Sequence, residues 1–457
     1  MTEIVDLHPS SERKRIAVIG SGIAGLGAAW ALRNTHDVTL YEKRARLGGH
    51  SATVDIDYDG TPIAVDTGFI VFNPLNYPNL CGLFEHLGIA STEADMSFGF
   101  ALKGQFEWCS NGLGGVFAQK RNLVKPTYLA MLRDILRFND LAPAALEAGE
   151  LDGLTIGQFL DRHGFGERFR INYLLPMGAA IWSSTEDGML DYPADALIRF
   201  FKNHRLMNMA RPQWRTVTGG SRTYVEAIAR DLGDRVRLSS PVREVRRGSG
   251  KAIVVTEDGT SAVYDDVILA CHSDQALAML SDADPEERDM LAAIPYAPNR
   301  VALHRDPSFM PDRKAAHAAW NYLRREPDAP ACVTYDMNRL QGIPAETPVY
   351  VTLNPDRLPD PALTFGVFEY DHPQFNRAGL AAQRIFNRIQ GRRNVWFAGA
   401  WLGYGFHEDG LRAGLRLALK LGGQIPWQFA EGDVDGGPWA DQAAQPAAAA
   451  AAWVAAE

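Results

Sequence analysis

A chain of 457 residues is too long for one compact hydrophobic core and is typical of two interleaved domains. Apolar residues make up 46% and charged residues 22%, an ordinary globular balance that argues against disorder. The net charge of −9 argues against a global basic field, so we expect no nucleic-acid partner. The cysteines form no CxxC pair, which suits a reducing compartment and predicts neither a disulfide framework nor a metal site: Cys81, Cys109, Cys271 and Cys332.

The N-terminal segment, MTEIVDLHPSSERKR, lacks the apolar core of a signal peptide. No stretch approaches the run of about 18 apolar residues that a membrane span requires. We therefore expect a cytoplasmic protein that is soluble or at most peripheral at the inner membrane.

The first regular elements predict a βαβ unit. Residues 15–19 (RIAVI) form a short apolar run that ends in glycine, as in a buried parallel strand. Residues 23–33 have helical spacing with small residues on one side, and residues 38–41 predict a second strand.

The following region, residues 70–215, is rich in aromatic residues and has a different character. It contains predicted helices near 126–138, 155–163 and 194–206. The α/β pattern returns near Gly219. The predicted elements are then a helix at 221–232, strands at 236–238, 242–245, 252–256 and 266–270, a mixed region at 290–375, a strand at 395–398 and a helix at 409–422.

This order predicts one nucleotide-binding domain assembled from three separated segments, with two insertions that build a substrate domain. The nucleotide-binding domain takes residues 15–70, 216–290 and 390–425, and the substrate domain takes 71–215 and 291–389. Residues 1–14 are a polar lead-in, and 432–457 are a flexible Ala-rich tail.

Residues 20–25 (GSGIAG) form a GxGxxG motif between the predicted strand and helix. The first glycine allows the tight turn, the second lets the backbone approach a pyrophosphate, and the third lets helix and strand pack closely. The helix N-terminus offers free N–H groups to the phosphates. An acidic residue about 20 positions on binds the ribose hydroxyls in such sites. The residues assigned to the cofactor here are Gly20, Gly22, Ile23, Ala24, Gly25 and Glu42.

Residues 42–53 (EKRARLGGHSAT) resemble the E-x-R-x-R-x-G-G-R-x-x-T segment of the flavin amine oxidase and phytoene desaturase superfamily. This resemblance implies that the cofactor is FAD, with the paired glycines close to the pyrophosphate and ribityl chain. A histidine replaces the arginine of many relatives, so the charge at that position depends on pH. The resemblance assigns to FAD Lys43, Arg44, Gly48, Gly49 and His50.

Later segments resemble further motifs of the same superfamily. Residues 66–69 (DTGF) resemble the D-x-G where the chain runs under the flavin, and 218–221 (TGGS) resemble the re-entry into the FAD domain. Residues 395–400 and 404–414 resemble the closing motif, whose helix start faces the flavin pyrimidine and stabilises the charge of the reduced flavin. The further residues assigned to FAD are Gly68, Phe69, Val242, Gly399, Ala400, Gly410 and Leu411, with Ala400 at a position that is usually acidic.

The predicted fold class is therefore α/β, with a Rossmann-like FAD-binding domain of the glutathione-reductase type and an inserted mixed α+β substrate domain. Segments such as AIWSS, LHRDPSFMP and YGFHEDGL resemble a bacterial subgroup of FAD-binding proteins associated with fatty-acid modification. The resemblance implies an FAD-dependent desaturase for a hydrophobic substrate, such as an unsaturated or methylated phospholipid acyl chain.

Two other functions stay open. A flavin amine oxidase would need an aromatic cage and usually a lysine near flavin N5, and the expected segment contains no convincing lysine. A non-redox flavin isomerase or mutase is the second alternative. Because no second GxGxxG predicts an NAD(P)H domain, we expect oxygen or an electron-transfer partner to reoxidise the flavin.

Three titratable residues, His407, Glu408 and Asp409, lie together beside the expected flavin face. As catalytic groups, His407 and Glu408 would transfer protons, with His407 favoured because its ordinary pKa lies near working pH. The alternative is a plain helix start, with Asp409 as N-cap and Glu408 complementing the helix dipole.

Aromatic residues of the second domain are candidates for the substrate pocket, although buried aromatics more often form core. We assign Trp182, Trp320 and Tyr322 to this pocket. Residues 198–209 alternate basic with apolar residues, so they fit either a peripheral membrane contact or an amphipathic helix that covers the substrate domain.

Overall fold

The computed structural model describes residues 13–208, 212–248, 250–326 and 329–431. The predicted tail at 432–457 and most of the predicted lead-in at 1–14 lie outside these ranges.

A five-stranded parallel sheet forms the centre of one half of the described chain. Its strands come from three segments far apart in the sequence, because β1 and β2 are N-terminal, β10 and β14 central and β20 C-terminal. The apolar run at β1 is buried on both faces, as expected of a central parallel strand. In order across the sheet, the strands are β10 (Val236–Arg237), β2 (Asp37–Tyr41), β1 (Arg15–Ile19), β14 (Asp266–Leu269) and β20 (Val395–Phe397).

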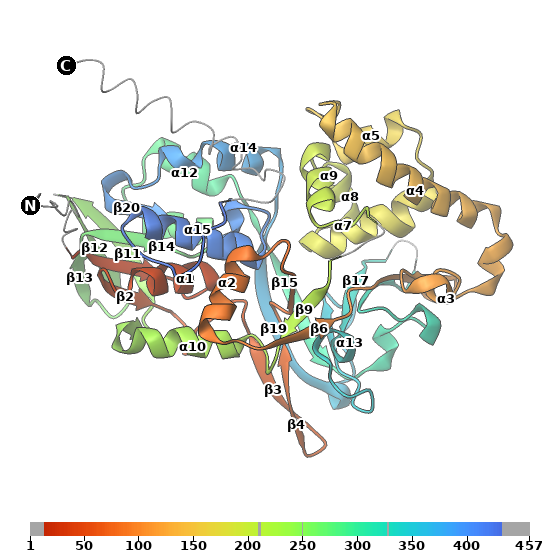
Figure 1. Cartoon of the computed structure of the whole chain (residues 1–457), viewed down its shortest axis with the longest axis horizontal. Coiled ribbons are helices and arrows are strands. Elements are labelled where there is room, and N and C mark those ends of the chain that lie inside the picture. Colours follow the sequence, from red (N-terminus) through yellow and green to blue (C-terminus); the bar gives the residue numbers. More distant parts are fainter. Residues whose placement is uncertain (1–12, 209–211, 249, 327–328, 432–457) are drawn as a thin grey trace, which may run out of the picture.

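Helices cover this sheet, and two of them pack unusually closely (Figure 1). At the contact between α1 and α15, a Cβ on Gly414 would lie only 2.0 Å from the carbonyl oxygen of Ala24, so glycine is required there. This close approach holds the middle of α15 against the start of α1. The helices around the sheet are α1 (Ile23–Leu32), α2 (Pro78–Leu87), α10 (Arg222–Leu232), α11 (Ser273–Met279), α12 (Pro285–Ala292), α14 (Arg377–Ile385) and α15 (His407–Lys420).

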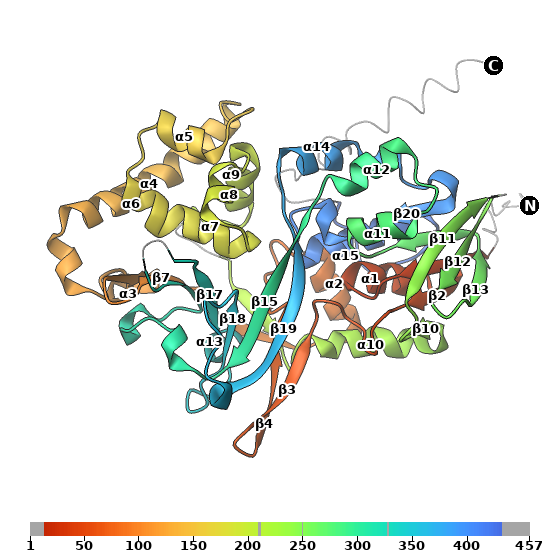
Figure 2. The same ribbon diagram turned by 180° about the vertical axis from the view of Figure 1, so that it is seen from behind.

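A seven-stranded mixed sheet forms the centre of the other half. Its long strands β15 and β19 pair along their whole length and run between the two halves (Figures 1 and 2). Both predicted insertions contribute to it: β7 and β8 come from the first insertion, and the other five strands come from the second. Its strands are β19 (Thr364–Pro373), β15 (Tyr296–His304), β18 (Tyr350–Leu353), β17 (Cys332–Asp336), β16 (Trp320–Arg324), β7 (Phe98–Leu102) and β8 (Phe106–Cys109).

A group of helices lies beyond this sheet, at the far end of the molecule from the parallel sheet (Figure 1). The helix predicted at 126–138 continues across Pro143, and the one predicted at 194–206 ends earlier, at Asn203. The elements are α3 (Gly112–Val116), η1 (Lys120–Val124), α4 (Pro126–Glu147), α5 (Ile156–Arg162), α6 (Glu167–Phe169), η2 (Arg170–Leu174), α7 (Leu175–Trp182), α8 (Glu186–Leu190) and α9 (Ala194–Asn203). The short helix α13 (Met337–Gln341) lies apart from them, against β17 and β18.

The membrane contact considered for residues 198–209 does not fit this arrangement. The apolar residues Ile198, Phe200 and Phe201 are buried in α9 and belong to the core. The amphipathic pattern therefore serves packing inside the protein, and Met209 lies outside the described residues. Within the described ranges, every helix is too short or too polar to cross a bilayer.

Three small sheets complete the described structure. The parallel sheet with its covering helices and the separate mixed sheet confirm the predicted fold class. The residue limits drawn for the two domains stay a prediction. The small sheets contain β3 (Thr53–Tyr58) with β4 (Thr61–Asp66); β5 (Val71–Phe72), β9 (Trp214–Val217) and β6 (Ser91–Ala94); and β11 (Val242–Gly248), β12 (Lys251–Thr256) and β13 (Ser261–Tyr264).

Candidate active site

The turn between β1 and α1 forms a backbone cradle at the edge of a large cavity. Gly22 lines the cavity, and a Cβ placed on it would meet no atom within 4 Å. Gly25 faces the other way, since a Cβ there would lie 1.8 Å from the Gly20 carbonyl oxygen. The second glycine therefore leaves space for a ligand, and the third allows the helix to pack on the turn.

The acidic residue at the end of β2 is held in place by the same turn. The Glu42 carboxylate accepts hydrogen bonds from the Ser21 backbone N–H at 3.1 Å and from the Ser21 hydroxyl at 2.5 Å. It also accepts one from the backbone N–H of Arg44 at 2.8 Å. Glu42 is buried and lines the cavity, the position that a ribose-binding carboxylate needs.

The cavity has a volume of about 820 Å³ and joins this cradle to the seven-stranded sheet. One end is lined by the glycine turn, by Glu42 and by residues 240–243. The other end lies between the sheet and the helices η2, α7 and α9. Its walls there are mostly apolar or aromatic, with side chains from Met96, Phe98, Trp108, Tyr173, Met177, Ile181, Phe200, Leu206, Trp214, Val301, Trp320, Tyr335, Val351 and Leu353.

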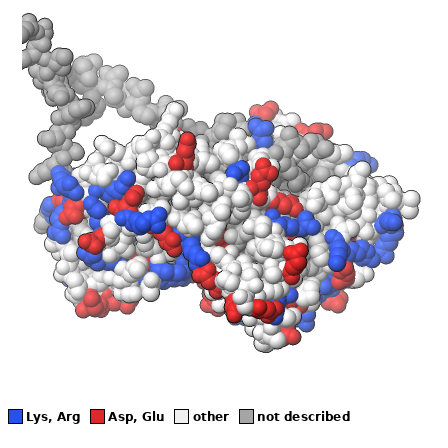
Figure 3. Space-filling view, turned by 60° about the horizontal axis from the view of Figure 1, so that its bottom comes forward, with Lys and Arg blue, Asp and Glu red and all other residues white. Residues whose placement is uncertain are grey.

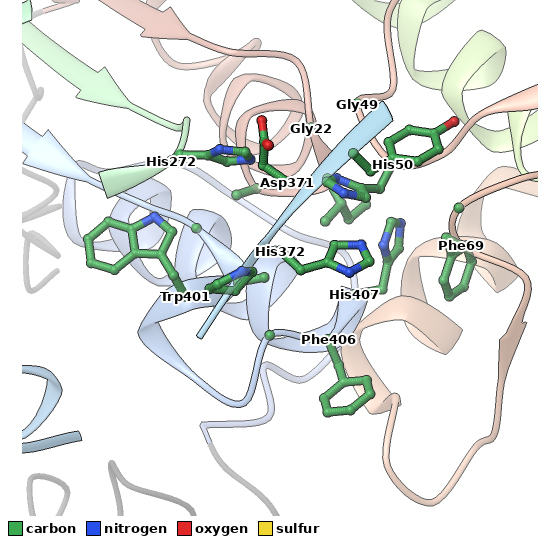
Figure 4. Close-up of a pocket in the computed structure, with 18 of the residues that line it drawn as sticks. Gly22, Gly49, His50, Phe69, His272, Asp371, His372, Trp401, Phe406 and His407 are labelled. Atoms are coloured by element: carbon green, nitrogen blue, oxygen red, sulfur yellow. The ribbon is translucent and has the colours of Figure 1, made fainter. Parts of the chain in front are cut away.

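Five histidines line the cavity: His204 lies at the end of α9, and the other four surround the middle of the cavity. Figure 4 shows three of these four, His50, His372 and His407, close together. The ring centroids of His50 and His372 are 5.4 Å apart, and the fourth histidine, His272, lies 6.5 Å from His50. Burial lowers the pKa of each imidazole, to about 4 for His372 and to about 3 for His407. The middle of the cavity therefore holds neutral imidazoles at neutral pH.

His407 is fixed by three neighbours. Its Nε2 lies 2.6 Å from the Tyr224 hydroxyl and 3.1 Å from the Ser51 hydroxyl, and its ring stacks on Phe69 with centroids 3.8 Å apart. The expectation of an ordinary pKa for His407 is wrong, because the sequence does not reveal this burial. A side chain bonded and stacked in this way is a poor candidate for a free base.

His372 makes fewer hydrogen bonds than His407. Its Nδ1 lies 2.9 Å from the Ser183 hydroxyl, at the end of α7. Ser183 has a φ of 51°, a left-handed conformation that is uncommon for a residue other than glycine. When Nδ1 carries the proton and donates it to Ser183, Nε2 keeps a lone pair that can accept a proton.

His50 offers a polar atom without a protein partner. Its Nε2 is buried and has no hydrogen-bond partner among the described residues, although the imidazole lines the cavity. A buried polar group in this state requires a partner. Together with the open space at Gly22, this group shows that the residues fit a cofactor bound along the cradle.

Most residues assigned to the cofactor from the sequence come together in this cavity, and a few do not. Gly25 and Gly48 lie behind the cradle, and Gly410 and Leu411 pack towards α1. Those that line the cavity are Gly20, Gly22, Ile23, Ala24, Glu42, Lys43, Arg44, Gly49, His50, Gly68, Phe69, Val242, Gly399 and Ala400.

Two of the three proposed pocket aromatics are misplaced. Trp320 lines the cavity, but Trp182 and Tyr322 do not. Trp182 stacks on Tyr192 in the helical core, and the Tyr322 hydroxyl donates to Glu186 at 2.9 Å. Conversely, His272, Tyr370, His372 and Trp401 line the cavity and were missed, because an isolated histidine or aromatic residue carries no local signal of its role.

Glu408 points away from the cavity and caps another helix. Its carboxylate accepts hydrogen bonds from the backbone N–H groups of Asn79 at 3.1 Å and Leu80 at 3.0 Å, and from the Asn79 amide at 2.7 Å. These backbone groups belong to the first turn of α2, whose own N-cap residue supplies no side-chain bond. Burial raises the pKa of Glu408 to about 7, while Arg412 and these donors oppose the rise.

Asp409 does stabilise the start of a helix, as the alternative interpretation predicted, but it is not the N-cap residue. The N-cap of α15 is Phe406, and Asp409 lies in the first turn, where its carboxylate accepts from the Phe406 backbone N–H at 3.0 Å. The carboxylate also accepts from the Tyr404 backbone N–H at 3.0 Å and pairs with Arg412. Of the three titratable residues, only His407 faces the cavity.

Because Glu408 caps α2, replacing it by alanine should lower the free energy of unfolding and leave the rate of flavin reduction largely unchanged. Two buried backbone N–H groups would lose their acceptor, at a cost of about 1–3 kcal/mol each. Urea unfolding measures the loss, and the glutamine variant, which keeps an acceptor, should lose less. Slower flavin reduction in Glu408→Gln at unchanged stability would restore the catalytic role.

The sequence matches the family model for flavin containing amine oxidoreductase over residues 23–361. This range includes the start of α1 and most of both halves described above. The chain belongs to this family. It is thus an FAD-dependent oxidoreductase, and the predicted superfamily, enzyme class and cofactor are confirmed.

The curated relatives of this oxidoreductase are named for different substrates. It is 28% identical over 356 residues to the carotenoid phi-ring synthase of Streptomyces griseus, covering 67% of this chain and 62% of that protein. It is 29% identical over 293 residues to a Mycobacterium tuberculosis protein named as a flavin-containing monoamine oxidase, covering 61% of each. The chain therefore spans less than two thirds of the length of either relative.

A solved structure shares the fold. Putrescine oxidase bound to putrescine superimposes with a TM-score of 0.66 over 90% of this chain and 99% of that one, at 18% sequence identity. This likeness supports the arrangement of a parallel sheet beside a separate mixed sheet. A small-molecule substrate, with oxygen or another electron acceptor, is consistent with this class of enzyme.

Proposed function

We propose that this oxidoreductase desaturates a hydrophobic chain, namely an unsaturated or methylated acyl chain of a phospholipid. The observation that carries the proposal is the apolar and aromatic lining of the cavity beyond the cofactor cradle. An apolar chamber of this kind stabilises a long hydrocarbon chain by the hydrophobic effect. Family membership by itself leaves the substrate open, because one relative is named for carotenoids and another for monoamines.

The charges around the cavity also favour a neutral substrate over an amine. Four imidazoles with lowered pKa values surround its centre and carry no charge at neutral pH. Among the described residues, Lys43 is the only lysine in the lining, and it lies with Glu42 at the cradle end. The lysine that an amine oxidase usually places near flavin N5 therefore has no candidate in the lining of the apolar end.

Desaturation removes a hydride and a proton from neighbouring carbons, and bound FAD supplies the hydride acceptor. The protein must then hold the chain, exclude water and accept the proton. We propose His372 as the proton acceptor, because its Nδ1 is fixed by Ser183 while the ring lines the cavity. His407, bonded to Tyr224 and Ser51, is proposed to tune the redox step without holding FAD.

The substrate should already contain a double bond. An isolated methylene is a poor hydride donor, whereas a carbon next to a double bond is activated because the developing charge is delocalised. The expected product is a conjugated diene that absorbs in the near ultraviolet and is lighter than its precursor by one hydrogen molecule.

Anaerobic mixing of the holoenzyme with substrate tests this function directly. Unsaturated or methyl-branched phospholipids should bleach the flavin absorbance, and mass spectrometry should find the diene. A saturated phospholipid of equal length is the matched control and should leave the flavin oxidised. If a simple amine bleaches the flavin and the phospholipids never do, the protein is an amine oxidase.

One specific observation favours the amine oxidase alternative. Glu369 and Asp371, on β19, line the cavity and would attract an ammonium group. Anaerobic mixing followed by mass spectrometry also identifies an isomerase or mutase, because such an enzyme would rearrange the lipid double bond without any net loss of hydrogen.

A further inference from the structure

An exposed apolar surface lies at the end of the molecule farthest from the parallel sheet. It is formed by η1 and the adjoining turns of α3 and α4, and we call it the η1 patch. Figure 1 shows α3 and the start of α4 at this end of the molecule. Leu113 is 78% exposed, Val124 is 82% exposed and Leu123 is 52% exposed. Exposed leucines continue along α4 at Leu129 and Leu136. Large apolar side chains exposed to water on neighbouring elements indicate an interaction surface.

The charges within the η1 patch are all of one sign. Between residues 112 and 133 the chain carries Lys120, Arg121, Lys125 and Arg133 and has no aspartate or glutamate, although the whole protein has a net charge of −9. Figure 3 shows Lys and Arg side chains gathered with uncharged surface at this end of the molecule. Apolar side chains flanked by basic ones match the chemistry of an anionic bilayer surface.

We infer that the η1 patch docks the protein onto an anionic phospholipid bilayer. Leu123 and Val124 lie between Lys120 and Lys125, so the tips of these apolar side chains can enter the acyl region while the ammonium groups meet lipid phosphates. A second copy of the chain fits this surface less well. A two-fold contact would bring the same basic residues of both copies together, and like charges repel.

The η1 patch also adjoins the apolar end of the cavity. Ser110 lines the cavity, and the patch begins three residues later at Leu113. Tyr173 lines it as well, two residues after the partly exposed Ile171. The chain segments around Ser110 and Tyr173 are joined by a hydrogen bond, in which the Trp108 indole donates to the Asn172 carbonyl at 3.1 Å. A docked enzyme would thus hold this end of the cavity near lipid; the delivery of an acyl chain rests on the proposed function.

Vesicle co-sedimentation of the FAD-loaded protein tests the docking without any turnover. Vesicles of phosphatidylglycerol and phosphatidylcholine in roughly equal amounts should bind it, and pure phosphatidylcholine vesicles should bind it much less. Lys120→Gln with Lys125→Gln should weaken binding by roughly fivefold per residue, hence about 25-fold together. Leu123→Ser with Val124→Ser should also abolish most binding. Lys120, Leu123 and Val124 are exposed and Lys125 is partly exposed, so we expect the variants to stay folded.

Matched controls change equivalent residues elsewhere. Arg230→Gln with Arg288→Gln removes two exposed basic groups on α10 and α12, and Val263→Ser removes an exposed valine on β13. These variants should bind the anionic vesicles like the unaltered protein. Equal losses in control and patch variants would overturn the inference, because binding would then follow net charge alone.

Flavin reduction and self-association distinguish bilayer docking from substrate turnover and from contact between copies. Flavin reduction by detergent-dispersed phospholipid should be the same in patch variants and unaltered protein. If no lipid ever reduces the flavin but vesicle binding depends on the patch, the docking stands and the proposed function fails. If the patch mutations abolish self-association measured without lipid, and vesicle binding does not depend on them, the surface is an interface between copies and the inference is wrong.

Discussion

Replacing Gly22 by valine should yield a folded protein without bound FAD. Gly22 has a φ of −64°, which valine also adopts, and a Cβ there meets no protein atom within 4 Å. The added side chain would instead fill the cavity at the start of α1, where the backbone N–H groups would hold the pyrophosphate of bound FAD. Overpacking at such a contact costs about 1–3 kcal/mol, which lowers FAD affinity by roughly 5- to 150-fold, and the loss of phosphate contacts should lower it further.

The flavin absorbance of the purified variant measures this loss, and circular dichroism checks the fold. Gly248→Val is a matched control, because its Cβ also meets no atom but lies at the end of β11, outside the cavity. Gly25→Ala gives a contrast, since its Cβ would collide with the Gly20 carbonyl and should damage folding itself. A yellow Gly22→Val protein with full flavin content would show that the cofactor does not bind along this turn.

Replacing His372 should slow flavin reduction by substrate while FAD content stays normal. A general base contributes on the order of 100- to 10,000-fold, and we expect a loss in this range for His372→Ala. Rapid mixing under anaerobic conditions measures the rate. His372→Gln keeps a hydrogen-bonding side chain without a basic nitrogen and should be equally slow. His86→Ala, which changes an exposed histidine on α2, is the control.

The pH dependence distinguishes this histidine from an ordinary one. A base must be neutral to accept a proton, and burial lowers the pKa of His372 to about 4. The neutral form therefore persists as the pH falls, and the reduction rate should stay constant from neutral pH down to about 5. A rate that falls along a titration near pH 6.5 would point to an exposed imidazole instead.

A comparison with His407→Ala completes this test. His407 is bonded to Tyr224 and Ser51 and stacked on Phe69, so its loss should change the flavin reduction rate less than the loss of His372. A larger effect at His407 would return the role of proton acceptor to the residue favoured by sequence alone.

The sequence determined the cofactor half of this protein because that half depends on local backbone geometry. The turn at residues 20–25 needs glycines at fixed spacing, and Glu42 must end the next strand. Short buried strands and a helix with small residues show the same local regularity. These features follow from neighbouring residues, so the fold class and FAD were predictable.

Only the tertiary structure decided the other half of the site. His50, His272, His372 and His407 are separated by long stretches of chain, and folding alone brings them to one cavity. The burial that lowers their pKa values is likewise a property of the packed molecule. The same reason explains Glu408, which looks catalytic beside His407 but turns to the N-terminus of α2, an element more than 300 positions earlier in the chain.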